Sequence, residues 1–429
     1  LGLGGLRASS CAGVPTLAPE LRMQQEVHAK VVGALQAATK EGDAAKRIQL
    51  LQQTADTVLR ADTQAETVAS CLDYFLNLKA DPNSSLRRYA AHFLERVLVF
   101  KPSLALRCTA AIASLLGDSD GTVKELAARA AVALHGRALL LISLEQESGQ
   151  HQWQLEHLHG MQEAMSGFLK TGCPDQVTLF HLAARWAKVA ILVQTPSPLL
   201  LRIRVPAELR GVSCLQDFPE VTHHLDLNAL RQHAEELFGL LLKLLQKCPN
   251  GSWSRSHFRV LLRCVTSVIR QRPMFVRPTL DAWALLMQQA AAALEGQAQK
   301  GDLPVAVADA AYLRQQIWSQ CQCLLASNVA AEHHGDVAEL LRAAGLSASM
   351  EDVLTQAKYQ QIAMATDQDV QESPAKRPRR TEIKRVWSGS GDGMLGDEDA
   401  FDADALLSGE AEVMCRRFED YFGLPSQRE

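Results

Sequence analysis

The side chains that most often perform chemistry, histidines and cysteines, are scattered along this sequence. Cys321 and Cys323 are two residues apart in a segment with a helical pattern, so they point to different sides of the helix. Metal ligands on one helix need a spacing of three or four. The neighbours His333 and His334 have the same problem, and the remaining histidine groups lack a set of cysteines or carboxylates around them: His223-His224 and His151, His157 and His159. We therefore expect no metal site, and we interpret these residues as ordinary thiols and histidines.

The motifs of cofactor binding and catalysis are also missing. Gly391, Gly393 and Gly396 match GxGxxG by letter, but they follow no strand pattern and lie among carboxylates that would repel a pyrophosphate. The sequence has no GxxxxGK[ST], HExxH or GxSxG, and no Ser/His/Asp or Cys/His set can be proposed from spacing. The sequence thus predicts no cofactor and no enzymatic activity.

One short segment is strongly basic. Six of the ten residues 376–385 are cations, and this run is short, contains proline and lies in a stretch too polar to fold alone. It is either a solvated run of charge or a nuclear import signal, and we favour import and a location in the nucleus. The residues of this predicted signal are Lys376, Arg377, Arg379, Arg380, Lys384 and Arg385.

Composition and charge narrow the class of protein. The chain has 429 residues, is 47% hydrophobic and only 5% aromatic, and is rich in Ala and Leu, which favours helix over strand. Residues 366–429 carry 15 acidic and 9 basic side chains; since the whole chain has a net charge of −4, residues 1–365 carry about +2. This weak charge gives little support to direct RNA binding. The longest apolar run of the helical body, near Ala131–Leu144, is interrupted and too short to cross a membrane, so no membrane is expected as a partner.

Helical patterns separated by short breaks fill residues 23–365, and they predict the domain organisation. Apolar residues recur at three- and four-residue spacing, and Asn83 is a natural N-cap. The stretch 195–225 interrupts the pattern with four prolines and predicts a long loop. We interpret residues 1–22 as a disordered leader and residues 366–429 as a disordered tail with an acidic stretch.

A faint internal repeat predicts how the helices pack. Asn83-Ser-Ser-Leu-Arg-Arg-Tyr-Ala-Ala resembles the segments that begin at Asp120 and Gln176. The first two copies are 37 residues apart, a length that suits a unit of two helices. Each copy has one large apolar residue followed by a pair of alanines, which would let neighbouring helices approach closely. The sequence therefore predicts an all-α solenoid of about six to seven helix pairs.

The stretch Ser267–Phe275, SVIRQRPMF, has the pattern of a corner between two helices. Arg270 and Arg272 are predicted in the last turn of the first helix, where cations favour its negative end, and Pro273 is expected to stop that helix.

This stretch also carries a resemblance to a known family. Val268–Phe275 is similar to the IARQRPMF helix end of the symplekin N-terminal domain. Weaker matches are Ser85–Val97, in the place of an EVRKFVIGFIEEA-like helix, and Ala183–Ile191, in the place of AIKFVEGLI. The long loop and the later KRPR segment also have counterparts in the family.

The resemblance implies a HEAT-type α-solenoid and a non-catalytic nuclear scaffold of pre-mRNA 3′-end cleavage and polyadenylation. Its implied partners are cleavage and polyadenylation factor subunits and a phosphatase of the RNA polymerase II C-terminal tail. Arg185, followed by Trp186, occupies the place of a basic contact residue, and Arg87, Arg88 and Lys124 begin equivalent helices and could line the same ridge. The alternative is a generic HEAT or armadillo adaptor, such as a transport or phosphatase regulatory subunit.

Overall fold

A computed structural model describes residues 19–60, 65–144, 151–172, 177–197, 225–248, 254–294, 307–325 and 332–343. The chain divides into two units, Leu1–Val370 and Gln371–Glu429, and all of the described residues belong to the first. Residues 1–18 of the predicted leader, most of the predicted loop 195–225 and the predicted tail lie outside the described residues, whereas residues 19–22 of that leader form the start of a helix.

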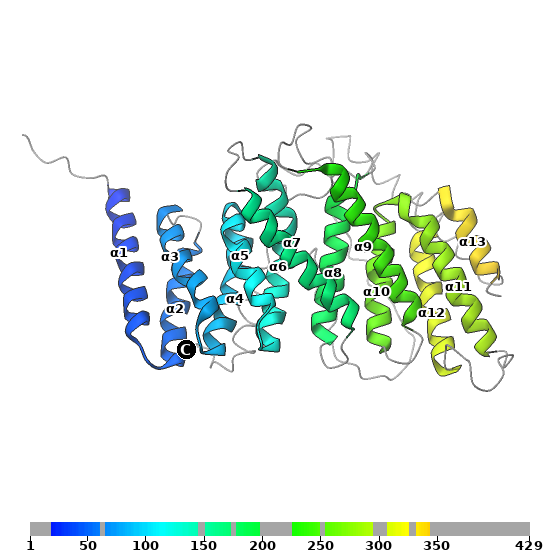
Figure 1. Cartoon of the computed structure of the whole chain (residues 1–429), viewed down its shortest axis with the longest axis horizontal. Coiled ribbons are helices and arrows are strands. Elements are labelled where there is room, and N and C mark those ends of the chain that lie inside the picture. Colours follow the sequence, from blue (N-terminus) through cyan, green and yellow to red (C-terminus); the bar gives the residue numbers. More distant parts are fainter. Residues whose placement is uncertain are drawn as a thin grey trace, which may run out of the picture. The chain divides into compact units, whose positions relative to one another are not determined.

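The described residues form helices and contain no strand, which confirms the predicted all-α solenoid (Figure 1). The thirteen α-helices described are α1 (Pro19–Lys40), α2 (Ala44–Val58), α3 (Ala65–Asn77), α4 (Ser84–Phe100), α5 (Ala105–Leu116), α6 (Gly121–Leu144), α7 (His151–Thr171), α8 (Val177–Gln194), α9 (Leu227–Lys247), α10 (Arg255–Ile269), α11 (Val276–Leu294), α12 (Val307–Leu325) and α13 (His334–Ala343). Short 3₁₀ turns precede three of them: η1 (Leu78–Ala80), η2 (Pro102–Leu104) and η7 (Pro273–Phe275).

The helices are arranged in two layers that follow the order of the chain. The even-numbered helices α2 to α12 each pack against the next even-numbered helix. In the other layer α1 packs on α3, α5 on α7, α9 on α11 and α11 on α13. Contacts such as α5 with α6 and α8 with α9 join the layers, so a continuous core runs between them.

The internal repeat read from the sequence marks the starts of α4, α6 and α8. Asn83 caps α4 by accepting a hydrogen bond from the backbone N–H of Ser85, and Asp120 accepts from Thr122 and Val123 at the start of α6. The large apolar residue of each copy is buried, and the small pairs are fully buried: Leu86, Val123 and Leu179, with Ala90-Ala91, Ala127-Ala128 and Ala183-Ala184. Small side chains at buried positions allow neighbouring helices to approach closely.

Two of these helices, α6 and α8, are long and apolar enough to cross a membrane by length and composition. Their most apolar windows are 67% and 61% buried inside the fold. Their apolar character is therefore that of helices in the centre of a two-layer stack, which have apolar neighbours on most sides.

Candidate protein-docking surface

The repeat provides a common register in which positions can be compared between helices. We count from the N-cap, which is Asp43 for α2, Asn83 for α4, Asp120 for α6 and Ser254 for α10; Gln176 is the equivalent residue before α8. In this register we compare the fourth and the ninth residue after the N-cap.

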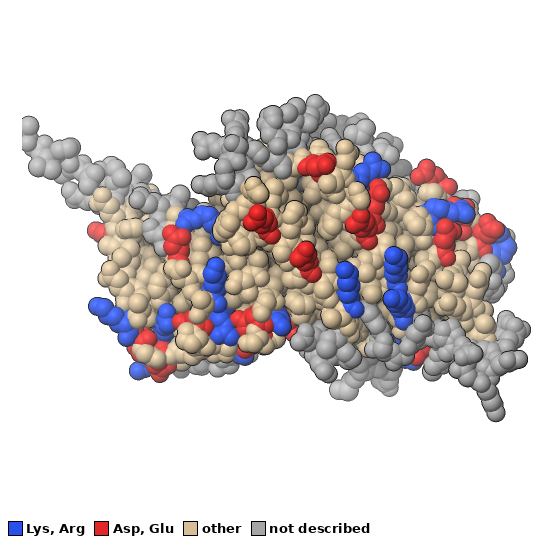
Figure 2. Space-filling view, in the orientation of Figure 1, with Lys and Arg blue, Asp and Glu red and all other residues tan. Residues whose placement is uncertain are grey.

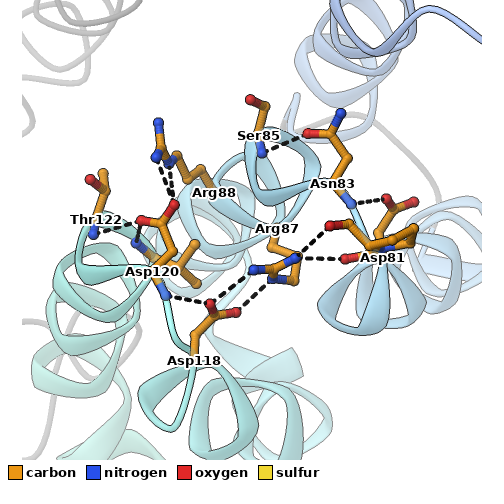
Figure 3. A network of polar contacts seen from close by, with 10 residues as sticks. Asp81, Asn83, Ser85, Arg87, Arg88, Asp118, Asp120 and Thr122 are labelled. Atoms are coloured by element: carbon orange, nitrogen blue, oxygen red, sulfur yellow. Dashed lines mark hydrogen bonds and ion pairs between the residues drawn. The ribbon is translucent and has the colours of Figure 1, made fainter.

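The fourth position builds an ionic ladder between neighbouring repeats. Arg47 of α2 pairs with Asp81, two residues before the N-cap of α4, at 3.0 Å. Arg87 of α4 pairs with Asp118, two residues before the Asp120 cap of α6, through Nε–Oδ2 and Nη2–Oδ1 distances of 2.6 and 3.0 Å. Arg87 also donates to the carbonyl oxygens of Asp81 and Pro82 (Figure 3). Each arginine therefore links the start of its own helix to the loop that precedes the next even-numbered helix.

Arg88 and Asp120 extend this ladder. Arg88 donates through Nε and Nη2 to Oδ2 of Asp120, at 3.2 and 2.6 Å. The side-chain hydrogen bonds from Arg87 and Arg88 lower the pKa of Asp118 and Asp120, respectively, although burial opposes the change. In Figure 2, Lys/Arg and Asp/Glu side chains are intermingled along the lower edge of the N-terminal helices.

The ladder bears directly on the residues predicted to contact a partner. The guanidinium groups of Arg87 and Arg88 are engaged within the fold, and Lys124 is half-buried at the start of α6. Trp186 is 0% exposed and packs edge-on against His135 at a centroid distance of 5.6 Å, so its indole belongs to the core and cannot touch a partner. Arg185, on α8, is half-buried like Lys124.

The fourth-position arginines of the ladder have no counterpart in α8 and α10, and the ion pair that joins α10 to α12 comes from another position, Arg255 Nε to Asp309 Oδ1 at 2.9 Å. The fourth position after the cap is Phe180 in α8 and Phe258 in α10, and both rings are buried. Phe180 lies 4.5 Å from the ring of His257, centroid to centroid, so an aromatic contact joins α8 and α10 where ion pairs join the earlier helices.

A buried arginine holds the other end of α8. Arg272 is only 2% exposed, and its Nη2 donates to the carbonyl oxygen of Leu192 at 2.6 Å. Its Nε donates to Oγ1 of Thr195 at 2.9 Å, and its Nη1 donates to the carbonyl oxygen of Gln271. These bonds satisfy groups at the carboxyl end of α8, where a cation is also favoured by the helix dipole.

This geometry corrects our interpretation of the stretch Ser267–Phe275. The helix α10 ends at Ile269, because Arg272 has extended backbone angles (φ −137°, ψ 84°) before Pro273. Pro273 begins η7 instead of only stopping the preceding helix. The side chain of Arg272 therefore caps a helix about 80 residues earlier in the chain, while its backbone N–H still donates to the carbonyl oxygen of Val268 in α10.

The ninth position after the cap forms a row of basic side chains on the even-numbered layer. The residues are His92, Arg129, Arg185 and Arg263 on α4, α6, α8 and α10. Arg129 and Arg263 are exposed, and His92 and Arg185 are half-buried. We call Arg129, Arg185 and Arg263 the basic row.

Lys188 adds a further cation beside this row. Burial raises the pKa of the Cys264 thiol to about 11, and the charges of Lys188 and Arg185 act in the opposite direction. Arg185 and Lys188 of α8 therefore lie close to Cys264 of α10, the residue that follows Arg263 in the sequence. Because α6, α8 and α10 pack in series, the basic row crosses three adjacent helices.

Arg129 and Arg263 were not among the residues predicted from the sequence, and neither was the capping role of Arg272. Counting nine residues from each N-cap would have found the first two, since the caps are visible in the sequence. Nothing in the sequence shows that Arg272 reaches α8. The predicted nuclear signal residues 376–385 lie outside the described part of the chain. Within that part there is no group of three or more His, Cys, Asp or Glu side chains that could hold a metal ion.

Comparison with known proteins gives one informative match. Residues 180–312, which run from α8 into α12 and make up less than half of the chain, match the Symplekin/PTA1 N-terminal family. A comparison with curated proteins gave no match. The crystal structure of an engineered protein matches over 68% of this chain and 99% of its own, at 13% identity and a TM-score of 0.35, values too low to carry an argument.

The matched segment contains Arg185, Lys188 and Arg263, and also the Arg272 corner whose sequence resembles the same family. The all-α repeat architecture agrees with that family assignment, and the family's role is that of a scaffold in mRNA 3′-end processing. Residues 180–312 are thus similar to the N-terminal domain of the symplekin family.

Proposed function

We propose that this chain is a non-catalytic nuclear scaffold of pre-mRNA 3′-end cleavage and polyadenylation, and that partners dock on the basic row. The observation that carries the proposal is the family match, which covers the helices that supply Arg185, Lys188 and Arg263. A solenoid suits this function because its stacked helices hold side chains that are far apart in sequence in one continuous surface.

The chemistry of the basic row favours protein partners with acidic surfaces. Arginine forms two parallel hydrogen bonds with a carboxylate, and such contacts fix orientation as well as adding affinity. We propose subunits of the cleavage and polyadenylation machinery and a phosphatase of the RNA polymerase II tail as partners. The net charge of about +2 over residues 1–365 is small for binding to RNA through phosphate contacts, which depends on many cations.

Affinity capture from a nuclear extract tests this proposal. The tagged full chain is expected to recover cleavage and polyadenylation subunits. The triple variant Arg129→Glu, Arg185→Glu, Arg263→Glu is expected to recover at least about tenfold less of them, because charge reversal places repulsion across the interface. Equal recovery by wild type and variant would refute docking on the basic row.

A matched control is available on the other layer. Lys170 of α7 and Lys243 and Lys247 of α9 are exposed, and their triple substitution by Glu makes the same change in net charge. This control variant should capture the same subunits as the wild type. An equal loss in both variants would show that capture depends on net charge and not on the basic row.

A generic adaptor remains the second candidate, since the helical repeat alone is compatible with it. Recovery of importins or nuclear pore proteins in place of processing subunits would support that candidate and exclude the first. The nuclear location is tested separately by substituting Lys376, Arg377, Arg379 and Arg380 with Ala, which should leave the chain in the cytoplasm.

A further inference from the structure

Three side chains from three helices form a continuous hydrogen-bonded chain next to the Arg272 corner. His135 of α6 and Gln194 of α8 are both 0% exposed, and His233 of α9 is half-buried. The distance from Gln194 Nε2 to His135 Nε2 is 3.0 Å, and that from Gln194 Oε1 to His233 Nδ1 is 2.9 Å. Gln194 therefore links two imidazoles that are almost 100 residues apart in the chain.

The chemistry of an amide restricts the protonation of both imidazoles. An amide has one acceptor side and one donor side. When its NH₂ group faces His135, Nε2 of His135 must accept and cannot carry a proton, while Nδ1 of His233 donates to Oε1. When the amide is rotated by 180°, Nε2 of His135 donates to Oε1. Nδ1 of His233 must then be unprotonated, so that it can accept from the NH₂ group. Each arrangement tolerates a proton charge on only one of the two histidines.

A second proton would therefore place two N–H groups against each other inside the protein. When the neutral His135 ring carries its proton on Nδ1, that N–H already has no acceptor in the described structure. The cost of the second proton therefore lies in the N–H group that meets the amide donor without an acceptor. Such a group is costly because water cannot reach it.

We propose that His135, Gln194 and His233 form a one-proton lock, which ties α6, α8 and α9 together while at most one histidine is charged and opens when both are. The lock joins α6, which lies outside the segment that matches the family, to α8 and α9, which lie within it. It is a conformational device that holds the first half of the repeat array to the second.

The surrounding charges decide which histidine takes the first proton. Around His233, the carboxylate of Glu236 raises its pKa, while burial, as the larger effect, and His159 of α7 lower it. His135 has the ring of Trp186 at its side, and the charge of His233 adds to the effect of burial. The guanidinium of Arg272 is a permanent cation at the same end of α8. His233 therefore takes the first proton, and His135 resists the second.

The pKa of His135 agrees with this order, because burial lowers it to about 3. A histidine with a pKa near 6.5 in the unfolded chain then contributes stability that is complete above pH 6.5 and is lost as the pH falls. The folding equilibrium constant falls by up to tenfold for each pH unit of that window, or about 15-fold between pH 6.5 and 5 from His135 alone.

Selective ¹⁵N-histidine labelling of the full chain tests the lock directly. Between pH 8 and 5 we expect the His135 ring to stay neutral with its proton on Nδ1, and only His233 to gain charge. Two independent titrations, each close to pH 6.5, would overturn the proposal. His135→Phe, in which one ring signal disappears, provides the assignment.

A variant provides the second measurement. A carboxylate accepts from two N–H groups at once, so Gln194→Glu should allow both histidines to be charged and should abolish most of the 15-fold loss between pH 6.5 and 5. The control is Gln53→Glu on the exposed side of α2, which makes the same change of side chain away from the lock and should keep the wild-type acid response. If Gln194→Glu folds and is as acid-sensitive as the wild type, the lock is refuted; if it does not fold, the histidine titrations alone decide.

Discussion

Two groups of helices, α2 to α6 and α8 to α11, can be compared because their even-numbered members share one repeat register. The two groups are joined by different chemistry. In the first group, part-buried ion pairs at the loops link each repeat to the next: Arg47–Asp81, Arg87–Asp118 and Arg88–Asp120. In the second group the equivalent positions are the buried rings of Phe180 and Phe258, and the polar links lie inside the core around Arg272 and Gln194. The same architecture can thus be held by surface electrostatics or by buried hydrogen bonds, and the two respond differently to mutation, acid and salt.

The largest difference is expected from removing the buried arginine. Arg272→Ala leaves the carbonyl oxygen of Leu192 and the hydroxyl of Thr195 without their donor and opens a cavity, so the free energy of unfolding should fall by about 3 kcal/mol or more. Urea unfolding followed by circular dichroism measures this. Arg272→Lys should recover only part of the loss, because an ammonium lacks the planar fork.

The neighbouring Arg270 provides the control for Arg272. It is exposed and has the same side chain two residues earlier, so Arg270→Ala should change stability by less than about 0.5 kcal/mol. Equal effects of the two substitutions would show that Arg272 does not clamp α8.

Acid should weaken the second group before the first. The lowered pKa of His135 implies a loss of about 2 kcal/mol between pH 6.5 and 5 at the α6–α8–α9 junction. The carboxylates of Asp118 and Asp120 have lowered pKa values, so their stabilisation is complete above about pH 4 and is lost only below it. Hydrogen exchange with mass spectrometry, corrected for intrinsic rates, should show peptides of α8 and α9 losing protection at pH 5 while those of α2 and α4 keep theirs. Loss of protection in α2 and α4 at pH 5, with α8 and α9 unchanged, would contradict this prediction.

A double-mutant cycle measures the ladder itself. Arg87 and Asp118 are largely shielded from water and make two parallel hydrogen bonds, so their coupling energy should be about 1–2 kcal/mol. Arg231 and Glu235 on α9 form an exposed pair four residues apart, whose coupling should be below about 0.5 kcal/mol. A coupling for Arg87–Asp118 as small as that of the exposed pair would show that the ladder contributes little.

Salt should give the smallest effect and act on the first group. Sodium chloride at about 1 M screens part-exposed ion pairs, so protection of α2 and α4 against hydrogen exchange should fall by less than about 1 kcal/mol, with a smaller change in α8 and α10. The variant Arg87→Ala, which lacks the main ion pair, should lose most of this salt dependence. Salt sensitivity concentrated in α8–α11 would contradict the assignment of ion pairs to the first group.

Much of the fold follows from local chemistry that can be read in the sequence. The helices α4 and α6 begin directly after Asn83 and Asp120, the first residues of two predicted repeat copies, because both side chains are strong caps. The predicted end of α10 was wrong at the corner where Arg272 precedes Pro273. Residues 270–272 continue a helical pattern, yet the backbone before Pro273 must be extended.

The candidate site was less predictable, because exposure and pairing depend on neighbours far away in the chain. Arg87 and Arg185 are both cations on the outer side of a repeat, yet Arg87 is held by a bidentate ion pair and Arg185 lies in the basic row. Trp186 follows Arg185 directly and is fully buried, since successive residues of a helix point about 100° apart.

The sequence by itself determined the helical class, the two-helix repeat and the positions of its caps, because these depend on residues close together in the chain. The tertiary structure decided which cations are internal links and which form a surface. Arg272 shows why: its partners Leu192 and Thr195 lie almost 80 residues before it, and only the packing of α8 against α10 brings them within hydrogen-bond distance.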